Sequence, residues 1–554
     1  MQKFEQSSVF KPRDLSGEDI NPRKVPVRTP IEECHTLFIN PTVNPDTQNP
    51  VLNAVMRSMF PMSMGYVAGY IEHVGLSKVY FVDQMVDEMD DAMLESLINA
   101  MPKPRVIGIS VLTATCGPAY YVGRLAKKID PECIVVMGGV HATVCPDEPI
   151  REKAADITVR GEGEETFAEL MECILAGKPY HQVAGITCLN PDGEMVNTES
   201  RALPKNLDDF PPFPYHLFAH NAKTYGIGFY SIQTSRGCPY KCTFCSQRSM
   251  TALSYRYVST ERALEDIETL VYDYGAKVIH LIDDNIAVNK KRLHRLLDEV
   301  IARGLHEKVT FEGAMRADNM DDDIYEKLQA ANFDLVTFGL ETGSERLMAQ
   351  MQKGETVECV VDAIEESKRR GFTVGTTIIF GFPTETWKER WDAIKMVFSM
   401  PADSVRFNIL TPYPGTAVYH EILDSGDEVK INKDWSNFSV QYMWEGSDLP
   451  YVAPDTNKWA LMFITMFANL AYYLRPKGIW KMMTSSVAGG NVIILPERWF
   501  LSGYLFKISR VALYLIGRFL QVFVMMCLTV PIDWIKRLIF GRSAPEPVHQ
   551  APAE

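Results

Sequence analysis

The stretch RGCPYKCTFC, residues 236–245, places three cysteines within eight positions of a 554-residue chain that has eleven cysteines in total. These three are Cys238, Cys242 and Cys245, with the spacing C-x3-C-x2-C. The other eight are scattered without a repeated spacing, which is not the pattern of a disulfide framework. The gathering of three thiols on one short loop therefore indicates that they bind one metal ion or cluster together. The scattered remaining cysteines indicate a reducing compartment.

Three thiolates on one loop can hold three corners of an iron-sulfur cube and leave the fourth iron open. A zinc site is the alternative, but zinc sites usually show paired C-x2-C units or a nearby histidine, and no such partner is found near this loop. The spacing therefore predicts one 4Fe-4S cluster bound by Cys238, Cys242 and Cys245, with one iron free for a small molecule.

Short apolar runs alternate with helical patterns on both sides of the loop, which is typical of parallel α/β sheets. The first set of expected strands covers residues 35–41, 78–83, 105–111, 133–139 and 155–161. The second covers residues 229–235, 277–284, 308–315, 335–343, 373–383 and 404–414. We expect an α/β fold with a Rossmann-like domain over 35–190 and a partial (β/α)6 barrel over 225–430, whose first strand directly precedes the cysteine loop.

The rest of the chain is assigned by composition. Residues 1–34 form a polar leader without the apolar core of a signal peptide, so export is not expected. The proline-dense region 191–224 predicts a linker. Beyond the barrel we expect a helical region over 431–500, in which 459–474 covers the barrel, an apolar and basic segment over 501–542, and a disordered tail over 543–554.

The charge balance excludes one class of partner. With 56 basic and 70 acidic residues the chain carries a formal charge of -14. Nonspecific binding to a polyanion needs a basic surface that neutralises phosphates. Nucleic acid is therefore not an expected partner.

Glycines and small polar residues gather where the strands of the first block end. Open α/β sheets bind ligands at the carboxyl ends of their strands, where glycine lets the backbone approach a bulky cofactor. The candidate residues at this edge are Gly108, Ser110, Thr113, Gly138, Gly139, His141, Gly161 and Glu162. A structural Rossmann domain without a ligand is the alternative that periodicity alone leaves open.

The cysteine loop after the first barrel strand resembles the signature of radical S-adenosylmethionine enzymes. The later motifs GLETGSERLM, IFGFPTET and TPYPGT follow in that superfamily's order. The resemblance implies that S-adenosylmethionine chelates the open iron and is cleaved reductively to a 5′-deoxyadenosyl radical. It further implies roles in binding S-adenosylmethionine for Phe244, Asp284, Arg316, Glu341, Gly381 and Pro412.

Several of these residues have a plainer interpretation. Phe244 could pack the loop, and the adjacent acids Asp283 and Asp284 could form a solvated turn. Arg316 offers a planar fork to the methionine carboxylate, but a surface salt bridge would use the same group. The order of the motifs after one cysteine loop, rather than any single residue, supports the resemblance.

The first block, with VMGGVHAT and VRGEGEE ahead of such a barrel, resembles the cobalamin-binding domain of cobalamin-dependent radical enzymes. The resemblance covers roughly residues 35–430 and implies that the edge residues named above bind cobalamin. The chain lacks the D-x-H-x-x-G motif, so His141, which lies in G-G-x-H, is not expected to ligate cobalt. A domain that has lost cobalamin is the alternative. Cys116 and Cys145 are interpreted as small core or loop residues rather than redox groups.

The resemblance implies an enzyme, most often a methyltransferase that adds a methyl group to an unactivated carbon. It implies an electron donor such as flavodoxin or ferredoxin, and no catalytic residue beyond the cofactor ligands is assigned. The anaerobic porphyrin cyclases of the same architecture make a non-methylating cyclase or rearrangement enzyme the alternative. A noncatalytic cobalamin or redox sensor is a third hypothesis, which the full set of barrel motifs disfavours.

Residues 504–540 are nearly all apolar. They carry Lys507, Arg510, Arg518, Lys536 and Arg537 against the single acid Asp533. Residues 511–530 are long enough to span a bilayer, but a charge near the middle, Arg518, is costly. A polar stripe also runs along this helix at intervals of three or four residues, formed by Lys507, Arg510, Tyr514, Arg518 and Gln521.

The favoured interpretation of this segment is a helix lying at the inner face of the membrane of a cytoplasmic protein. A span, a cap on the core and a dimer contact are the alternatives. Membrane contact favours a lipid-like or tetrapyrrole substrate.

Overall fold

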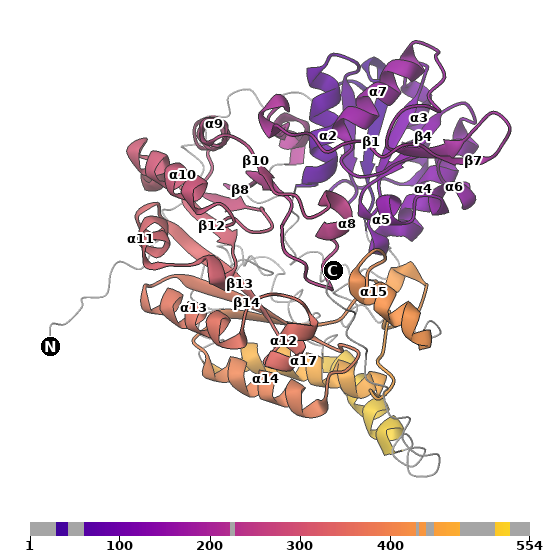
Figure 1. Ribbon diagram of the computed structural model, residues 1–554. Helices are drawn as coiled ribbons and strands as arrows, with labels where there is room; N and C mark the ends of the chain where they lie inside the picture. The colour runs from indigo at the N-terminus through magenta and orange to yellow at the C-terminus, as the bar shows by residue number, and fades with distance from the viewer. Residues whose placement is uncertain are drawn as a thin grey trace, which may run out of the picture.

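The structure is a computed structural model and describes residues 29–42, 60–221, 228–427, 431–438, 448–476 and 516–531. Two α/β domains lie side by side, the first drawn in indigo to purple and the second in magenta to orange (Figure 1). Each is built around a largely or wholly parallel sheet. The expected fold class, a Rossmann-like domain followed by an open six-stranded partial barrel, is confirmed.

The first sheet has the order β2-β1-β3-β4-β5-β6-β7. Its strands are β1 (Thr36–Asn40), β2 (Val79–Asp83), β3 (Val106–Ser110), β4 (Ile134–Gly138), β5 (Ile157–Val159), β6 (Ile186–Leu189) and β7 (Met195–Asn197). The strands from β2 to β5 pair in parallel, as expected, and sheets of this order bind ligands where the strand order switches between β1 and β3. The antiparallel hairpin β6–β7 was not expected, because strands of four and three residues leave almost no periodic signal.

Helices connect the strands of this domain and cover its two faces (Figure 1). They are α2 (Met62–His73), α3 (Asp91–Ala100), α4 (Cys116–Ile129), α5 (Val140–Val144), α6 (Glu148–Arg151) and α7 (Glu164–Leu175). The short helices α5 and α6 follow β4, so they lie at the carboxyl edge of the sheet where the candidate ligand residues gather.

The second sheet has the order β15-β14-β13-β12-β11-β8, and all its pairs are parallel. Its strands are β8 (Phe229–Ile232), β11 (Val278–Leu281), β12 (Thr310–Ala314), β13 (Phe333–Glu341), β14 (Thr373–Phe380) and β15 (Ser404–Ile409). The helices between them are α9 (Thr260–Tyr272), α10 (Lys290–Ala302), α11 (Asp322–Ala330), α12 (Glu345–Gln350), α13 (Val357–Arg369) and α14 (Trp387–Ser399). All six strands lie within or next to the expected ranges.

The proline-dense segment expected as a linker is packed into the core. Phe210, Phe213 and Phe218 are buried, and the ring of Phe218 lies 4.8 Å from that of Phe81 on β2. Prolines keep this segment extended, and its aromatic side chains fill the space between the domains. One continuous apolar core therefore extends from the first sheet into the second.

Helix α17 (Lys458–Leu474) covers the edge strand β15, as the sequence predicted for residues 459–474. The Asn469 side chain accepts a hydrogen bond from the Phe407 N–H at 3.2 Å and donates one to the Phe407 carbonyl at 2.8 Å. Tyr472 donates to the Ala402 carbonyl at 2.6 Å. These bonds pair backbone groups that an open sheet edge would otherwise leave exposed.

The C-terminal segment is described over residues 516–531, where it forms a helix. The ring of Phe463 on α17 lies 5.2 Å from that of Phe519 and 5.5 Å from that of Phe523, so this helix packs on α17. Within the described ranges, no helix combines the length and apolarity needed to cross a bilayer. Residues 1–28, the rest of the 501–542 segment and the tail 543–554 lie outside the described residues.

Glu389 joins two helices of the barrel. Its carboxylate accepts hydrogen bonds from the Thr386 N–H at 2.9 Å, from Ser344 at 2.7 Å and from Arg346 at 2.8 Å. Burial alone would raise the pKa of Glu389, but these donors lower it to about 2. The start of α14 is therefore tied to the start of α12 by an ionised carboxylate.

We expect Glu389→Gln to destabilise the protein by about 2 kcal/mol at neutral pH, after a discount for solvent screening. Because the folded-state pKa lies below the ordinary value, the stabilisation is present above about pH 5 and is lost as the pH falls through 4.5 towards 2. The wild-type Tm should thus fall more than the variant's between about pH 5 and pH 3 in circular dichroism. Glu358→Gln, at an exposed position in the first turn of α13, is the control. Parallel Tm curves for wild type and Glu389→Gln would contradict this role.

Candidate functional site

The three cysteines lie on the loop between β9 (Ser235–Arg236) and α8 (Gln247–Thr251), at the carboxyl end of β8. All three are half-buried. The Thr243 N–H donates to the Met351 carbonyl at 2.9 Å, and the Val418 N–H donates to the Thr243 carbonyl at 3.0 Å. The loop that carries the thiols is therefore anchored between the end of α12 and the start of α15 (Ala417–Ile422).

Gly237, immediately before the first cysteine, is required by the backbone. Its φ is +87°, and a Cβ there would lie 2.2 Å from the Ser254 carbonyl oxygen. No other residue fits this position without moving the backbone. The glycine thus sets the direction in which the chain enters the cysteine loop.

The donors around this loop fit an iron-sulfur cluster with a bound S-adenosylmethionine. Three half-buried sulfurs are soft ligands of the type that iron-sulfur clusters use. The hydroxyls of Thr243 on the loop and of Thr411 after β15 are buried and have no hydrogen-bond partner among the described residues. Polar groups left in this way at the carboxyl edge of a sheet are suited to a polar ligand.

Asp283 anchors the start of the loop. It is buried, and its Oδ1 accepts hydrogen bonds from the Thr234 N–H and the Ser235 N–H, each at 2.7 Å. Burial raises the pKa of this carboxyl group. The solvated-turn alternative therefore does not describe Asp283, whose function is to position the chain that leads into the cysteines.

Asp284, the neighbour predicted to bind S-adenosylmethionine, is exposed and accepts a 2.6 Å hydrogen bond from Gln247 at the start of α8. Arg316 is buried, and its Nε and Nη2 donate to Asp318 at 3.0 and 2.8 Å. Its guanidinium also lies 3.6 Å from the centre of the Tyr240 ring on the cysteine loop. Arg316 thus forms a salt bridge, but a buried one and not the surface pair of the alternative, and its binding of S-adenosylmethionine stays a prediction.

Glu341 ends β13 in a strained conformation, with a φ of +63°. Its Oε2 accepts a 3.0 Å hydrogen bond from Thr377, and a Cβ at Gly339 would lie 2.1 Å from its Oε1. A non-glycine side chain held at a positive φ points to function. The prediction that Glu341 binds S-adenosylmethionine is consistent with this position.

The remaining predicted residues of the barrel also lie at its carboxyl edge. The Phe244 ring is 6.4 Å from that of Phe382 and perpendicular to it, so Phe244 packs the loop, as one alternative held. Gly381 follows β14 with a φ of +92°, and Pro412 is buried after β15. The structure thus brings all six residues to one end of the sheet, and their contacts with S-adenosylmethionine stay predictions.

The carboxyl edge of the first sheet is assembled by its glycines. The φ of Gly139 is +103°, and a Cβ there would lie 2.9 Å from the Val111 carbonyl oxygen. The Gly161 N–H donates to Thr143 at 2.9 Å, and a Cβ at Gly161 would meet nothing within 4 Å. Together with half-buried Ser110 and Gly138, these residues bring three strand ends to one edge, as the sequence predicted.

Four predicted cobalamin residues lie elsewhere or carry other contacts. Gly108 is inside β3, and a Cβ there would lie 2.5 Å from the Phe38 ring, so this glycine serves packing. Glu162 forms ion pairs with Arg236 and Arg256 of the second domain. His141 is fully buried, and its Nδ1 lies 3.3 Å from the hydroxyl oxygen of Thr113, which is also buried. Tertiary packing gives these four residues neighbours inside the protein, and their binding of cobalamin stays a prediction.

The two carboxyl edges face each other. Helix α5 at the first edge contacts α8, which follows the cysteine loop (Figure 1). A Cβ at Gly415 would lie 2.6 Å from Val144 of α5, and the Ser249 hydroxyl of α8 donates to the Gly415 carbonyl at 2.7 Å. Both predicted ligand edges therefore lie next to each other.

Arg236 joins the two edges through buried ion pairs. Its guanidinium lies 3.1 Å from Glu162 and 2.7 Å from Glu164, which begins α7. The rings of Tyr66 and Phe210 lie 5.1 and 5.5 Å from the same group. Sequence reasoning did not assign a role to Arg236, although its position two residues before the first cysteine is a signal that could have identified it.

Comparison with known proteins identifies the family to which this chain belongs. The Radical SAM superfamily profile matches residues 232–397, and the B12 binding domain profile matches residues 49–171, which together are more than half of the chain. The chain belongs to the cobalamin-dependent radical SAM enzymes. The cofactors of this family are the 4Fe-4S cluster, S-adenosylmethionine and cobalamin, and they are those expected from the sequence.

Relatives of this enzyme include methyltransferases and cyclases. It is 29% identical over 443 residues to an uncharacterized methyltransferase of Pyrococcus horikoshii, covering 79% of this chain and 93% of the relative. It is 26% identical to the anaerobic magnesium-protoporphyrin IX monomethyl ester cyclase of Rubrivivax gelatinosus, covering 67% of each chain. It is 24% identical to the hopanoid C-3 methylase of Methylococcus capsulatus, covering 72% of this chain and 74% of the relative.

Solved structures share the fold of this enzyme. The radical S-adenosylmethionine methyltransferase TsrM of Kitasatospora setae, with cobalamin and a cluster bound, matches with a TM-score of 0.61 at 17% identity, covering 79% of this chain and 95% of that chain. The cobalamin-dependent radical enzyme OxsB matches with a TM-score of 0.58 at 20% identity, covering 73% of this chain and 56% of that chain. Both likenesses concern the arrangement of the two domains.

Alanine variants of the adjacent acids Asp283 and Asp284 should distinguish a role in positioning the cysteine loop from a role in binding S-adenosylmethionine. We expect Asp283→Ala to lose most of its cluster iron and to unfold at a lower temperature, because each hydrogen bond to a buried carboxylate is worth about 1.5–3 kcal/mol. Asp284→Ala should keep its iron and stability but bind S-adenosylmethionine more weakly, by about tenfold or more. Iron analysis, thermal melts and equilibrium binding measure these effects, and equal iron loss in both variants would contradict the assignment.

Proposed function

We propose that this enzyme is a radical C-methyltransferase that adds a methyl group to an unactivated carbon of a lipid-like or other small organic substrate. The packing of α5 against α8 carries the proposal, because it sets the predicted cobalamin edge beside the cysteine loop. A methyl group supplied by one cofactor can reach a carbon activated by another only if both share one chamber. The methyltransferases among the relatives agree with this use of the architecture.

In this proposal the residues of the chain bind the cofactors and orient the substrate. Cys238, Cys242 and Cys245 would hold the cluster, and the open edge around Gly139 and Gly161 would hold the corrin. When bound, the cluster and S-adenosylmethionine supply the radical that removes a hydrogen atom, and cobalamin supplies the methyl group. The buried contacts of Asp283 and Arg236 fix the position of the cysteine loop relative to the first domain. A substrate carbon bound between the two strand edges would then face both cofactors.

The cluster needs a source of electrons, and we expect a separate protein to supply them. The chain has one C-x3-C-x2-C loop, which provides ligands for a single cluster. A reduced flavodoxin or ferredoxin is the class of donor that such a cluster accepts. The cyclases among the relatives favour oxygen insertion or ring closure as the second candidate reaction.

Reconstitution with iron, sulfide and hydroxocobalamin under anaerobic conditions should give about four irons and one cobalt per chain. With reduced flavodoxin, deuteromethyl S-adenosylmethionine and a membrane-lipid extract, we expect 5′-deoxyadenosine and a deuteromethylated lipid in mass spectra. Replacement of Cys238, Cys242 and Cys245 by alanine should abolish iron binding and both products but keep cobalt. A product that gains a ring or an oxygen without the labelled methyl group would support the cyclase instead.

We further propose that the enzyme contacts the cytoplasmic face of a membrane through a C-terminal apolar face. In the helix 516–531, Ile516, Leu520, Val524 and Leu528 are all more than half exposed. They recur every four residues, so they form one stripe on the side of the helix that faces away from the protein. A stripe of four aliphatic side chains in water is unusual for a surface helix.

Two neighbouring helices extend this face. The Phe463 ring on α17 lies 5.5 Å from that of Phe523 and 6.1 Å from that of Phe467, which in turn lies 6.3 Å from the Trp391 ring on α14. Further exposed apolar side chains on α14 and α17 are Trp387, Phe398 and Leu474. The C-terminal apolar face therefore spans three helices and is rich in aromatic rings, which favour a bilayer interface.

Charge favours a bilayer over a second copy of the chain. The region 504–540 is basic within a protein of net charge -14, which suits an anionic lipid surface. Arg518, whose position near the middle of the apolar run disfavoured a span, is buried and donates to Gln521 at 2.7 Å. Its charge is thus turned towards the protein, and the apolar stripe is left for lipid. The other members of the predicted polar stripe, Lys507, Arg510 and Tyr514, lie outside the described residues.

The full chain should float with vesicles that contain anionic lipid. We expect the double variant Leu520→Glu and Leu528→Glu to reduce vesicle binding at least about tenfold, because burial of one leucine is worth about 1.5–3 kcal/mol. The control adds two charges at exposed apolar positions elsewhere, Leu189→Glu and Tyr272→Glu, and should bind like wild type. If the C-terminal variant instead converts a dimer to a monomer in ultracentrifugation and wild type does not float, the face is a dimer contact.

A further inference from the structure

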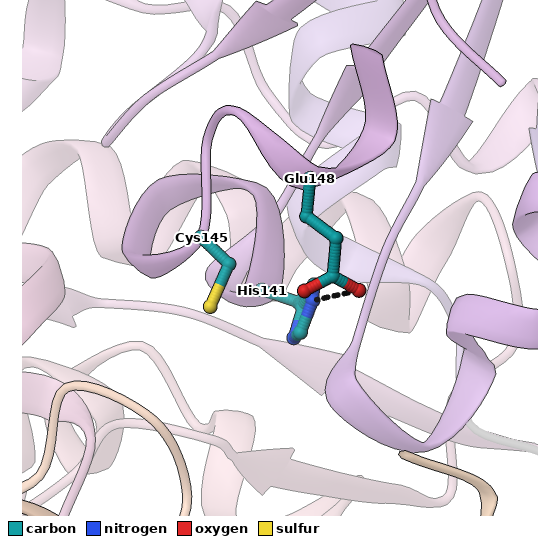
Figure 2. A group of neighbouring side chains, drawn as sticks. All are labelled: His141, Cys145 and Glu148. Atoms are coloured by element: carbon teal, nitrogen blue, oxygen red, sulfur yellow. Dashed lines mark ion pairs between the residues drawn. The ribbon is translucent and has the colours of Figure 1, made fainter. Parts of the chain in front are cut away.

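A second group of metal-ligating side chains lies in the first domain, on α5, on the turn after it and at the start of α6. His141, Cys145 and Glu148 each offer one ligand atom, and these atoms all lie within 4.8 Å of one another. Figure 2 shows the three side chains on the same side of this turn, with the ion pair between His141 and Glu148 dashed. The three residues are separate from the cysteine loop and belong to an eight-residue stretch, 141–148.

One ring nitrogen of the buried His141 imidazole, Nε2, has no hydrogen-bond partner among the described residues. The residue is fully buried, and its Nδ1 is occupied by the Thr113 hydroxyl at 3.3 Å. Its Nε2 lies 3.6 Å from Glu148 Oε1, which is too far for a hydrogen bond. A buried polar atom left in this way calls for a missing partner.

Glu148, the second member of the group, is already oriented by hydrogen bonds from other elements. Glu148 Oε1 accepts hydrogen bonds from Trp435 Nε1 at 2.7 Å and from the Tyr120 hydroxyl at 3.2 Å. The Trp435 ring also lies 5.1 Å from the His141 ring. The Thr113 contact at His141 Nδ1 and the two hydrogen bonds to Glu148 hold the imidazole and the carboxylate in place, as outer partners of metal ligands do.

We propose that His141, Cys145 and Glu148 bind one zinc ion. Ligands around a tetrahedral zinc lie about 3.2–3.8 Å from one another, given bond lengths of about 2.0–2.3 Å, so the 3.6 Å separation of Nε2 and Oε1 fits one edge of the site. Small side-chain rotations would bring the sulfur to the same distance. The mixed nitrogen, sulfur and oxygen donors suit zinc, whereas magnesium and calcium take oxygen ligands.

The surroundings allow a metal ion to enter and give it a structural consequence. Cys145 and Glu148 are only partly buried, so the site opens to solvent on their side. A zinc ion bound there would join the end of α5 to the start of α6, under the turn that carries Trp435. Since α5 also contacts α8, the ion would stiffen the segment behind the junction of the two domains. This proposal does not depend on the reaction that the enzyme catalyses.

The zinc content of the tag-free full chain, purified anaerobically and measured by mass spectrometry of the elements, tests the site. We expect about one zinc per chain after dialysis against a weak chelator, and at least a tenfold loss in Cys145→Ser and in Glu148→Gln. Cys173→Ser, at a half-buried thiol on α7 of the same domain, should keep its zinc. Iron content and thermal melts show whether each variant is folded.

X-ray absorption at the zinc edge distinguishes this site from the cysteine loop, because the method sees zinc alone. One sulfur at about 2.3 Å with nitrogen and oxygen ligands at about 2.0–2.2 Å would support the proposal. Three sulfur ligands would place the zinc at Cys238, Cys242 and Cys245 and overturn it. Absence of zinc in wild type, even after addition of zinc sulfate, would also overturn it and leave His141 and Glu148 as an ion pair.

Discussion

The buried ion pairs of Arg236 are the interaction on which the site depends. The residue comes two positions before the first cysteine, and its guanidinium binds the carboxylates of Glu162 and Glu164 from the other domain. All three side chains are at most 13% exposed. Removal of one partner from such a pair leaves an uncompensated buried charge, which costs about 3–5 kcal/mol. The position of the cysteine loop relative to the first sheet is therefore fixed by electrostatics as well as by apolar packing.

The orientation of both sheets agrees with this constraint. Parallel strands present their carboxyl ends at one edge, where glycines and short polar side chains leave room for large ligands. In this enzyme the two edges meet, with α5 of one against α8 of the other, and the buried aromatic segment around Phe213 fills the space beside them. Asp283 completes the arrangement by holding the backbone that leads into the cysteines. Each of these contacts helps to hold the two strand edges next to each other.

The C-terminal region adds two features to this core. Helix α17 closes the open edge of the barrel through Asn469, and the helix 516–531 packs on it with an aliphatic stripe turned outwards. The zinc site proposed behind α5 would stiffen the opposite side of the junction. The C-terminal apolar face and the zinc site are both proposals about the surroundings of the two strand edges. Neither concerns the chemistry between those edges.

The cysteine spacing, the order of the barrel motifs and the two alternating blocks were enough to predict both domains and, through the family they resemble, the cofactors. Period and spacing are local properties, so the sequence by itself determined them. Only the tertiary structure decided which neighbour each polar side chain or glycine meets. It placed Gly108 under Phe38, gave Glu162 to Arg236 of the other domain, and buried His141 beside Glu148 and the Trp435 ring. These surroundings are built by elements from distant parts of the chain, and no local pattern encodes the packing that brings them together.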